Sequence, residues 1–143
     1  MKTFRHVLNT WLLANLLHPF LFAFYLMIKG DEFAAASIPV LFIAGPVLAI
    51  PSLLLSLTFL NWLYKTHQHT LIKQTIWMVL VPIALLCNYI LVLFLFDLEA
   101  SFFRDIEFLM PALASAWIAI LLRTYQLQDL FIDKIAEHEN SMV

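Results

Sequence analysis

The chain has 143 residues, of which 63% are hydrophobic and 13% are charged, with a formal net charge of −2 and a single cysteine. Soluble domains average roughly 45–50% apolar and about 25% charged residues, so a chain of this length could not bury its apolar side chains in an aqueous core. We therefore expect one integral membrane domain in a lipid bilayer, and we expect neither a disulfide framework nor a nucleic-acid partner.

Four apolar runs follow one another, over residues 7–28, 38–64, 75–96 and 108–122. The first three are long enough to cross about 30 Å of hydrocarbon at about 1.5 Å per residue, whereas the fourth needs flanking residues or a thinner bilayer. The sequence thus predicts an all-α polytopic membrane protein, with a four-helix transmembrane domain in residues 1–122. Residues 123–143 form a cytoplasmic tail with a short amphipathic helix at its start.

The first run begins after a charged stretch, as a signal peptide does. It is longer than the usual apolar region of a signal peptide, and no small-residue cleavage site follows it before Lys29. We therefore interpret it as a retained span, with a cleavable signal peptide as the alternative.

The second run contains three prolines and a glycine. Pro39 stands at its start, where a helix tolerates proline. Further into the run lie Gly45, Pro46 and Pro51. Pro46 and Pro51 each remove a helical hydrogen bond, so we expect a bend in this run. In lipid the freed carbonyls must find other donors, which makes this bend a candidate hinge or site.

Each run brings a polar residue to about the same depth in the membrane. These residues are Asn15, His18, Ser52, Asn88 and Ser115. The layer is either a binding site or polar constriction, or it is hydrogen-bonded packing worth about 0.6 kcal/mol per pair, and the second interpretation is the more common one. The fourth run also carries small residues four apart, which allow close helix packing within or between monomers: Ala112, Ser115, Ala116 and Ala119.

The distribution of Lys and Arg predicts the orientation. Six of the eight lie on the side of the two termini and of the loop between the second and third runs. By the positive-inside rule this side is cytoplasmic. Trp62, Tyr64 and Trp77 flank that loop, as expected of aromatic residues at a membrane interface.

Motifs for catalysis or metal binding are missing. His67 and His69 form an H-x-H pair, but no cysteine or carboxylate cluster accompanies them. With two glycines in the chain, no phosphate-binding loop can be built. We therefore expect no metal and no cofactor, and an enzyme is the least favoured class.

The tail has two faces at helical spacing. One face is apolar and the other is acidic, and together they consist of Leu127, Asp129, Leu130, Phe131, Asp133, Ile135 and Glu137. Anionic lipid repels an acidic face, so we expect the tail to bind protein: a neighbouring subunit, the cytoplasmic loop or a separate cytoplasmic partner. The alternative is a solvated helix end.

Span number, size and an inward tail are similar to those of small four-span membrane subunits of bacterial multi-component systems, including the membrane component of the Kiwa anti-phage system. This resemblance implies a bacterial inner membrane and a role in stress or phage defence. From the uncharged spans, the missing catalytic motifs and the patterned tail, we expect a non-enzymatic, homo-oligomeric subunit that scaffolds or recruits a cytoplasmic protein at the membrane. The alternatives are an oligomeric channel or pore-forming effector, and a small lipid-active enzyme or carrier.

Overall fold

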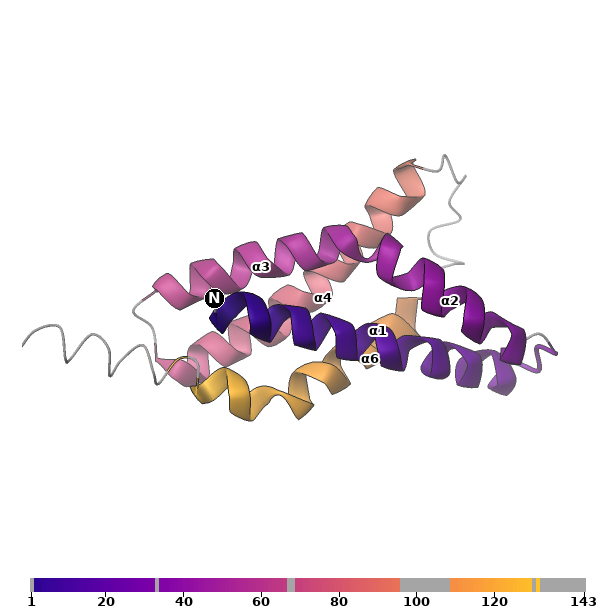
Figure 1. Ribbon diagram of the computed structural model, residues 1–143, viewed down its shortest axis with the longest axis horizontal. Coiled ribbons are helices and arrows are strands. Elements are labelled where there is room, and N and C mark those ends of the chain that lie inside the picture. Colours follow the sequence, from indigo (N-terminus) through magenta and orange to yellow (C-terminus); the bar gives the residue numbers. More distant parts are fainter. Residues whose placement is uncertain (1, 33, 67–68, 96–108, 130, 132–143) are drawn as a thin grey trace, which may run out of the picture.

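The computed structural model describes residues 2–32, 34–66, 69–95, 109–129 and 131, and in this part of the chain all regular structure is helical. The helices are α1 (Lys2–Ile28), α2 (Ala34–Leu48), α3 (Ile50–Lys65), α4 (Thr70–Leu95) and α6 (Leu109–Leu122). After a turn at Arg123, residues 124–129 are helical again. The helices form one bundle, in which α1 crosses the middle of the view in Figure 1 and α4 runs obliquely towards the upper right.

Two helices, α1 and α4, are long and apolar enough to cross a membrane. The pair α2 and α3 makes a third candidate span if the two helices, which meet at a 48° bend, form one broken crossing. The remaining helix, α6, has 14 residues and is shorter. Many large apolar side chains lie on the outside of the bundle, such as Phe24, Ile43 and Phe94. Such a surface is consistent with an all-helical membrane protein, in which lipid rather than water would contact these side chains.

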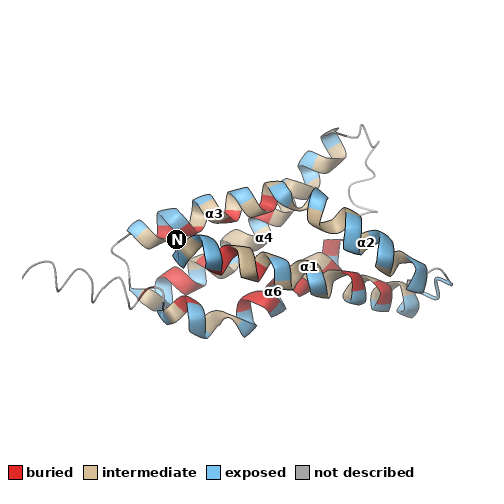
Figure 2. Cartoon of the chain, viewed as in Figure 1, coloured by how far each residue is buried: buried red, intermediate tan, exposed pale blue. Residues whose placement is uncertain are grey.

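The buried side chains lie where the helices face one another, as the red segments of Figure 2 show. Helix α1 packs against α2, α3 and α6, while α4 packs against α3 and α6. The buried core cluster is at the end of the bundle where α1 and α4 begin, and consists of Val7, Leu60, Leu63, Trp77, Ile120, Leu127 and Phe131. This end also holds the end of α3 and the segment after α6, at the left of Figure 1.

The turn after α1 is set by Gly30, whose φ is +78°. Its N–H donates to the Met27 carbonyl at 3.1 Å, and the Asp31 N–H donates to the Leu26 carbonyl at 3.0 Å. This pair of bonds is the Schellman motif, which favours glycine because the left-handed conformation strains other residues. The turn sends the chain back along α1 as α2.

Our placement of Pro39 at the first position of a helix is wrong. The helix begins at Ala34, and Pro39 lies inside it. The segment before Pro39 is AAASI. Alanine has the highest helix propensity of all residue types, so this segment extends the helix by about one turn.

The break between α2 and α3 is at Ala49, between Pro46 and Pro51. Pro51 lies in the first turn of α3, where its missing N–H costs little to that helix. The same missing N–H deprives the Val47 carbonyl of its helical donor, so α2 cannot continue through this point. The bend therefore follows from the local sequence.

Candidate functional site

A cavity of about 230 Å³ lies inside the bundle, between α1, the bend, α4 and α6. Its lining extends from Val7 to Phe22 on α1 and from Trp77 to Val92 on α4. At about 1.5 Å per residue, each of these segments rises about 22 Å. A cavity of this volume with a lining of such length is elongated along the bundle.

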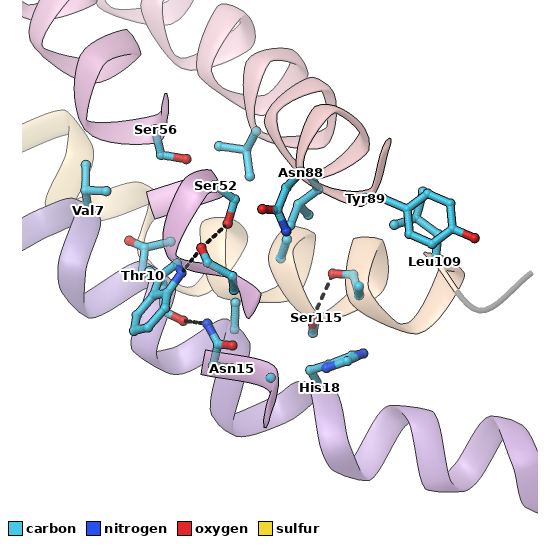
Figure 3. Close-up of a pocket in the computed structure, with 18 of the residues that line it drawn as sticks. Val7, Thr10, Asn15, His18, Ser52, Ser56, Asn88, Tyr89, Leu109 and Ser115 are labelled. Carbon is cyan, nitrogen blue, oxygen red and sulfur yellow. Dashed lines mark hydrogen bonds between the residues drawn. The ribbon is translucent and has the colours of Figure 1, made fainter. Parts of the chain in front are cut away.

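All five residues of the predicted polar layer line this cavity. Asn15 and His18 come from α1, Ser52 from α3, Asn88 from α4 and Ser115 from α6. Figure 3 shows their side chains arranged around one space. The rest of the lining is mostly apolar, and none of the described lining residues is Asp, Glu, Lys or Arg.

Asn15 and His18 lie against the backbone of α2 at Gly45. A Cβ atom added to Gly45 would be 3.8 Å from Asn15 Oδ1 and 3.9 Å from His18 Nδ1, which is ordinary van der Waals contact. Asn15 Nδ2 donates to the Trp11 carbonyl at 2.9 Å, and the His18 ring packs edge-on to Phe22 at 5.9 Å. A side chain larger than alanine at position 45 would therefore meet these two polar groups.

Side chains from two neighbouring helices satisfy the carbonyls at the bend. Asn88 Nδ2 donates to the Leu48 carbonyl at 3.0 Å, and Trp11 Nε1 donates to the Ala49 carbonyl at 3.1 Å. Ser52 Oγ also donates to the Ala49 carbonyl, at 2.7 Å. These bonds, with Trp11 from α1 and Asn88 from α4, hold the broken span in the bundle. Of the predicted polar layer, Asn88 thus donates to a helix distant in sequence, whereas Asn15, Ser52 and Ser115 donate to carbonyls three or four residues before them.

Two polar atoms in the lining are left without a hydrogen-bond partner among the described residues: Trp77 Nε1, a donor, and Asn88 Oδ1, an acceptor. Trp77 is only 1% exposed. A buried unpaired polar group costs about 1–3 kcal/mol, and in a native structure such a group calls for a specific explanation. The two residues are eleven positions apart on α4, so about 16 Å of helix rise separates them.

Trp77 is buried among the helices, whereas its level at the membrane interface stays a prediction. The sequence pattern placed Trp62 and Trp77 alike, but only Trp62 is exposed, at 54%. Trp77 packs in the core because it lies on the face of α4 that also carries Val81, Leu85 and Asn88, at helical spacing. The same spacing is the sequence signal that could have identified Trp77 as a lining residue. Trp11 was missed as well, although it lies one turn before Asn15.

The small residues of α6 pack within the monomer. Ser115, Ala116 and Ala119 are buried, and Ala112 lines the cavity. The Ser115 hydroxyl donates to the Ala112 carbonyl at 2.8 Å. These small side chains thus allow α6 to pack closely against α1.

The tail residues assigned to partner binding divide into three groups. Leu127 and Phe131 are buried in the core cluster, with 2% and 1% exposure. Asp129 is exposed. The others lie outside the described residues: Leu130, Asp133, Ile135 and Glu137. Leu127 and Phe131 therefore contact the protein's own bundle, and recruitment of a cytoplasmic partner stays a prediction.

Among the described residues, no three His, Cys, Asp or Glu side chains are grouped as metal ligands. His69 precedes α4, and its Nδ1 accepts the Leu71 N–H at 3.4 Å, a role in ending the loop. His67, the other half of the H-x-H pair, is outside the described residues.

No protein-family model, curated protein or solved structure matches this chain.

Proposed function

We propose that this protein is a non-enzymatic integral membrane subunit that binds one uncharged, chain-like molecule from the lipid phase inside its helix bundle. The observation that carries this proposal is the elongated cavity with an unpaired donor, Trp77 Nε1, and an unpaired acceptor, Asn88 Oδ1, in its lining. Both atoms are buried beneath the surface of the cavity, so a bound molecule would pair with them once the two side chains turn towards it.

The lining determines the chemistry of the ligand. Because it carries no described charged residue, an ionised ligand would lose its hydration without gaining a counter-charge. The volume of about 230 Å³ lies below the range of about 300–1,000 Å³ that is typical of ligand pockets, which argues against a folded lipid with two acyl chains. A single hydrocarbon chain bearing a hydroxyl or carbonyl group fits both limits. The same lack of charge leaves no carboxylate for proton coupling, so ion transport is not part of the proposal.

The proposal includes a topology of four spans with both termini in the cytoplasm. Helix α6, which rises about 21 Å, would form the fourth span by tilting little and thinning the bilayer around it. The exposed apolar faces of α2 and α4 would be available for lipid or for a second copy of the chain. An inner bacterial membrane, oligomer formation and a role in defence belong to the proposal as well.

Photolabelling tests ligand binding. Purified protein in lipid nanodiscs is irradiated with a long-chain alcohol that carries a diazirine, and the labelled peptides are identified by mass spectrometry. We expect labels on the cavity face of α4, between Trp77 and Asn88. Labels confined to exposed residues such as Phe94 would refute the proposal.

A matched pair of variants on α6 provides the control. Ala112→Leu places three carbon atoms in the cavity, whereas Ala114→Leu adds the same atoms at a residue outside the lining. We expect Ala112→Leu to abolish labelling of the cavity while stability is kept or raised by about 0.5–2 kcal/mol, as in other filled cavities. We expect Ala114→Leu to label like the wild type. Equal labelling of the two variants would show that the probe does not bind in the cavity.

A further inference from the structure

A second cavity lies at the end of the bundle where α1 begins and the chain leaves α6. It is a cleft of about 320 Å³, separate from the ligand cavity proposed above. It is lined by Lys2, Arg5, His6, Asn9, Arg123, Gln126 and Asp129. Three cationic side chains and one carboxylate leave a formal surplus of two positive charges in the described lining. The proposed function does not use any of these residues.

Arg123 is held in place across the cleft by α1. Its Nε donates to Thr10 Oγ1 at 3.1 Å, and the Thr10 hydroxyl donates to the His6 carbonyl at 2.8 Å. The bond to Thr10 uses one of the five N–H groups of the Arg123 guanidinium. The other N–H groups, at the planar end of the side chain, can donate to an anion. Arg123 and Thr10 are 113 positions apart in sequence, so only the folding of the chain brings them together.

No ion pair within the described residues offsets the charges of Arg5 and Arg123. Burial, and then the charge of Arg5, lowers the pKa of Arg123 from its ordinary value. Arg123 remains cationic at neutral pH because the ordinary pKa of a guanidinium is so high. Asp129 lines the same cleft, but within the described part of the chain it forms no ion pair with Arg5 or Arg123. An anion bound between the two guanidinium groups would offset their repulsion.

His6 supplies an independent observation. It is 6% exposed, and its Nδ1 has no hydrogen-bond partner among the described residues. It lines the cleft beside Arg123. A buried ring nitrogen without a partner is costly. Because Nδ1 is fully buried, the ring must turn for this nitrogen to donate to an oxyanion in the cleft, for which an imidazole N–H is a good donor.

We infer that this cleft binds a phosphate group, with Arg5, Arg123 and His6 as its main ligands. Two guanidinium groups can each donate two parallel hydrogen bonds to phosphate oxygens, and Lys2 adds positive charge at the rim. The distribution of Lys and Arg predicts that this end is cytoplasmic, and basic clefts at the cytoplasmic ends of membrane helices suit anionic lipid head groups. The phosphate could equally belong to a soluble phosphate ester, because the recognised chemistry is the same.

The test compares lipid and soluble sources of phosphate with the full-length protein. Protein purified in dodecyl maltoside is titrated with phosphatidylglycerol, with phosphatidylcholine and with glycerol 3-phosphate, and bound molecules are counted by native mass spectrometry. We expect one tightly bound anionic molecule per chain. Binding of phosphatidylglycerol alone identifies a lipid head group, and binding of glycerol 3-phosphate identifies a soluble ester. Equal retention of phosphatidylcholine and phosphatidylglycerol, with no binding of the ester, overturns the inference.

Two single substitutions separate the cleft from the general charge at this end. Arg5→Gln removes a cation that lines the cleft, and Lys65→Gln removes an exposed cation that does not line it. Because Arg5 would donate directly to the phosphate, and a hydrogen bond to a charged group contributes about 1.5 kcal/mol or more, we expect Arg5→Gln to weaken anion binding about tenfold. We expect Lys65→Gln to leave it unchanged. Arg5 is exposed, so its loss should not prevent folding, and circular dichroism checks this. Equal weakening by both substitutions would mean that the anion responds to surface charge alone.

Discussion

The docking of the tail onto the bundle can be tested with the substitution Phe131→Ala. Phe131 is 1% exposed and belongs to the core cluster with Trp77 and Leu127. The Lys73 ammonium lies 5.0 Å from the centre of its ring. The substitution thus removes a buried ring and a cation–π contact together.

The expected loss of stability follows from these contacts. Replacing a buried phenylalanine by alanine costs about 3–5 kcal/mol, because it removes apolar contact and leaves a cavity. A cation–π contact of a poorly hydrated ammonium contributes up to about 2 kcal/mol and is part of that total. Phe131 is near the end of the described chain, where the segment can adjust, so we expect a loss of about 3 kcal/mol in the free energy of unfolding.

Reversible unfolding in mixed micelles of dodecyl maltoside and sodium dodecyl sulfate, followed by circular dichroism, measures this loss. Tyr125→Ala is the matched control, because Tyr125 lies in the same tail segment but is 73% exposed. We expect the control to change stability by less than about 0.5 kcal/mol. Limited digestion with trypsin should also cut faster after Arg123 in Phe131→Ala.

If Phe131→Ala and Tyr125→Ala had the same small effect, the tail would not be docked. Phe131 would then be available to a cytoplasmic partner, as the sequence pattern suggested. A loss near 3 kcal/mol would instead restrict any partner to tail residues other than Leu127 and Phe131.

Two further predictions concern the bend. In Asn88→Leu the Leu48 carbonyl loses its donor, so we expect the free energy of unfolding to fall by about 0.6–1.7 kcal/mol. The control is Ile90→Leu, on the exposed face of α4. If Asn88→Leu caused no loss, water would have replaced the amide as the donor. The double variant Pro46→Ala, Pro51→Ala restores two backbone donors, and straightening the 48° bend would lengthen the distance between spin labels at Ser37 and Lys65 by about 4 Å. An unchanged distance would show that packing against Asn88 and Trp11, rather than proline, maintains the bend.

Much of the fold is readable in the sequence, because lipid imposes simple demands. A helix must be apolar over enough residues to cross the membrane, and α1, α4 and the broken pair α2 and α3 show this directly in their composition. The prolines of the second run mark the break for a similar reason, since a missing N–H acts locally. The depth of the polar residues along each helix also follows from counting residues. The structure then brings all five around one cavity.

Other features depend on which faces of the helices meet. Hydropathy does not distinguish a lipid-facing side chain from a buried one, because both are apolar, and for this reason Trp62 and Trp77 looked equivalent in sequence. For the same reason, the apolar face of the tail could not be assigned to the bundle or to a partner before Phe131 was located.

The sequence by itself determined that the chain is helical and apolar enough for a membrane, where its second apolar run bends, and which apolar run carries each polar residue of the layer. Only the tertiary structure decided which of those groups are paired and which are not. Asn88 Nδ2 has a partner on α2 and its Oδ1 has none among the described residues, and Arg123 lies beside Thr10. Such pairings depend on the rotation and separation of whole helices, which are set by packing across the bundle rather than by any local run of residues.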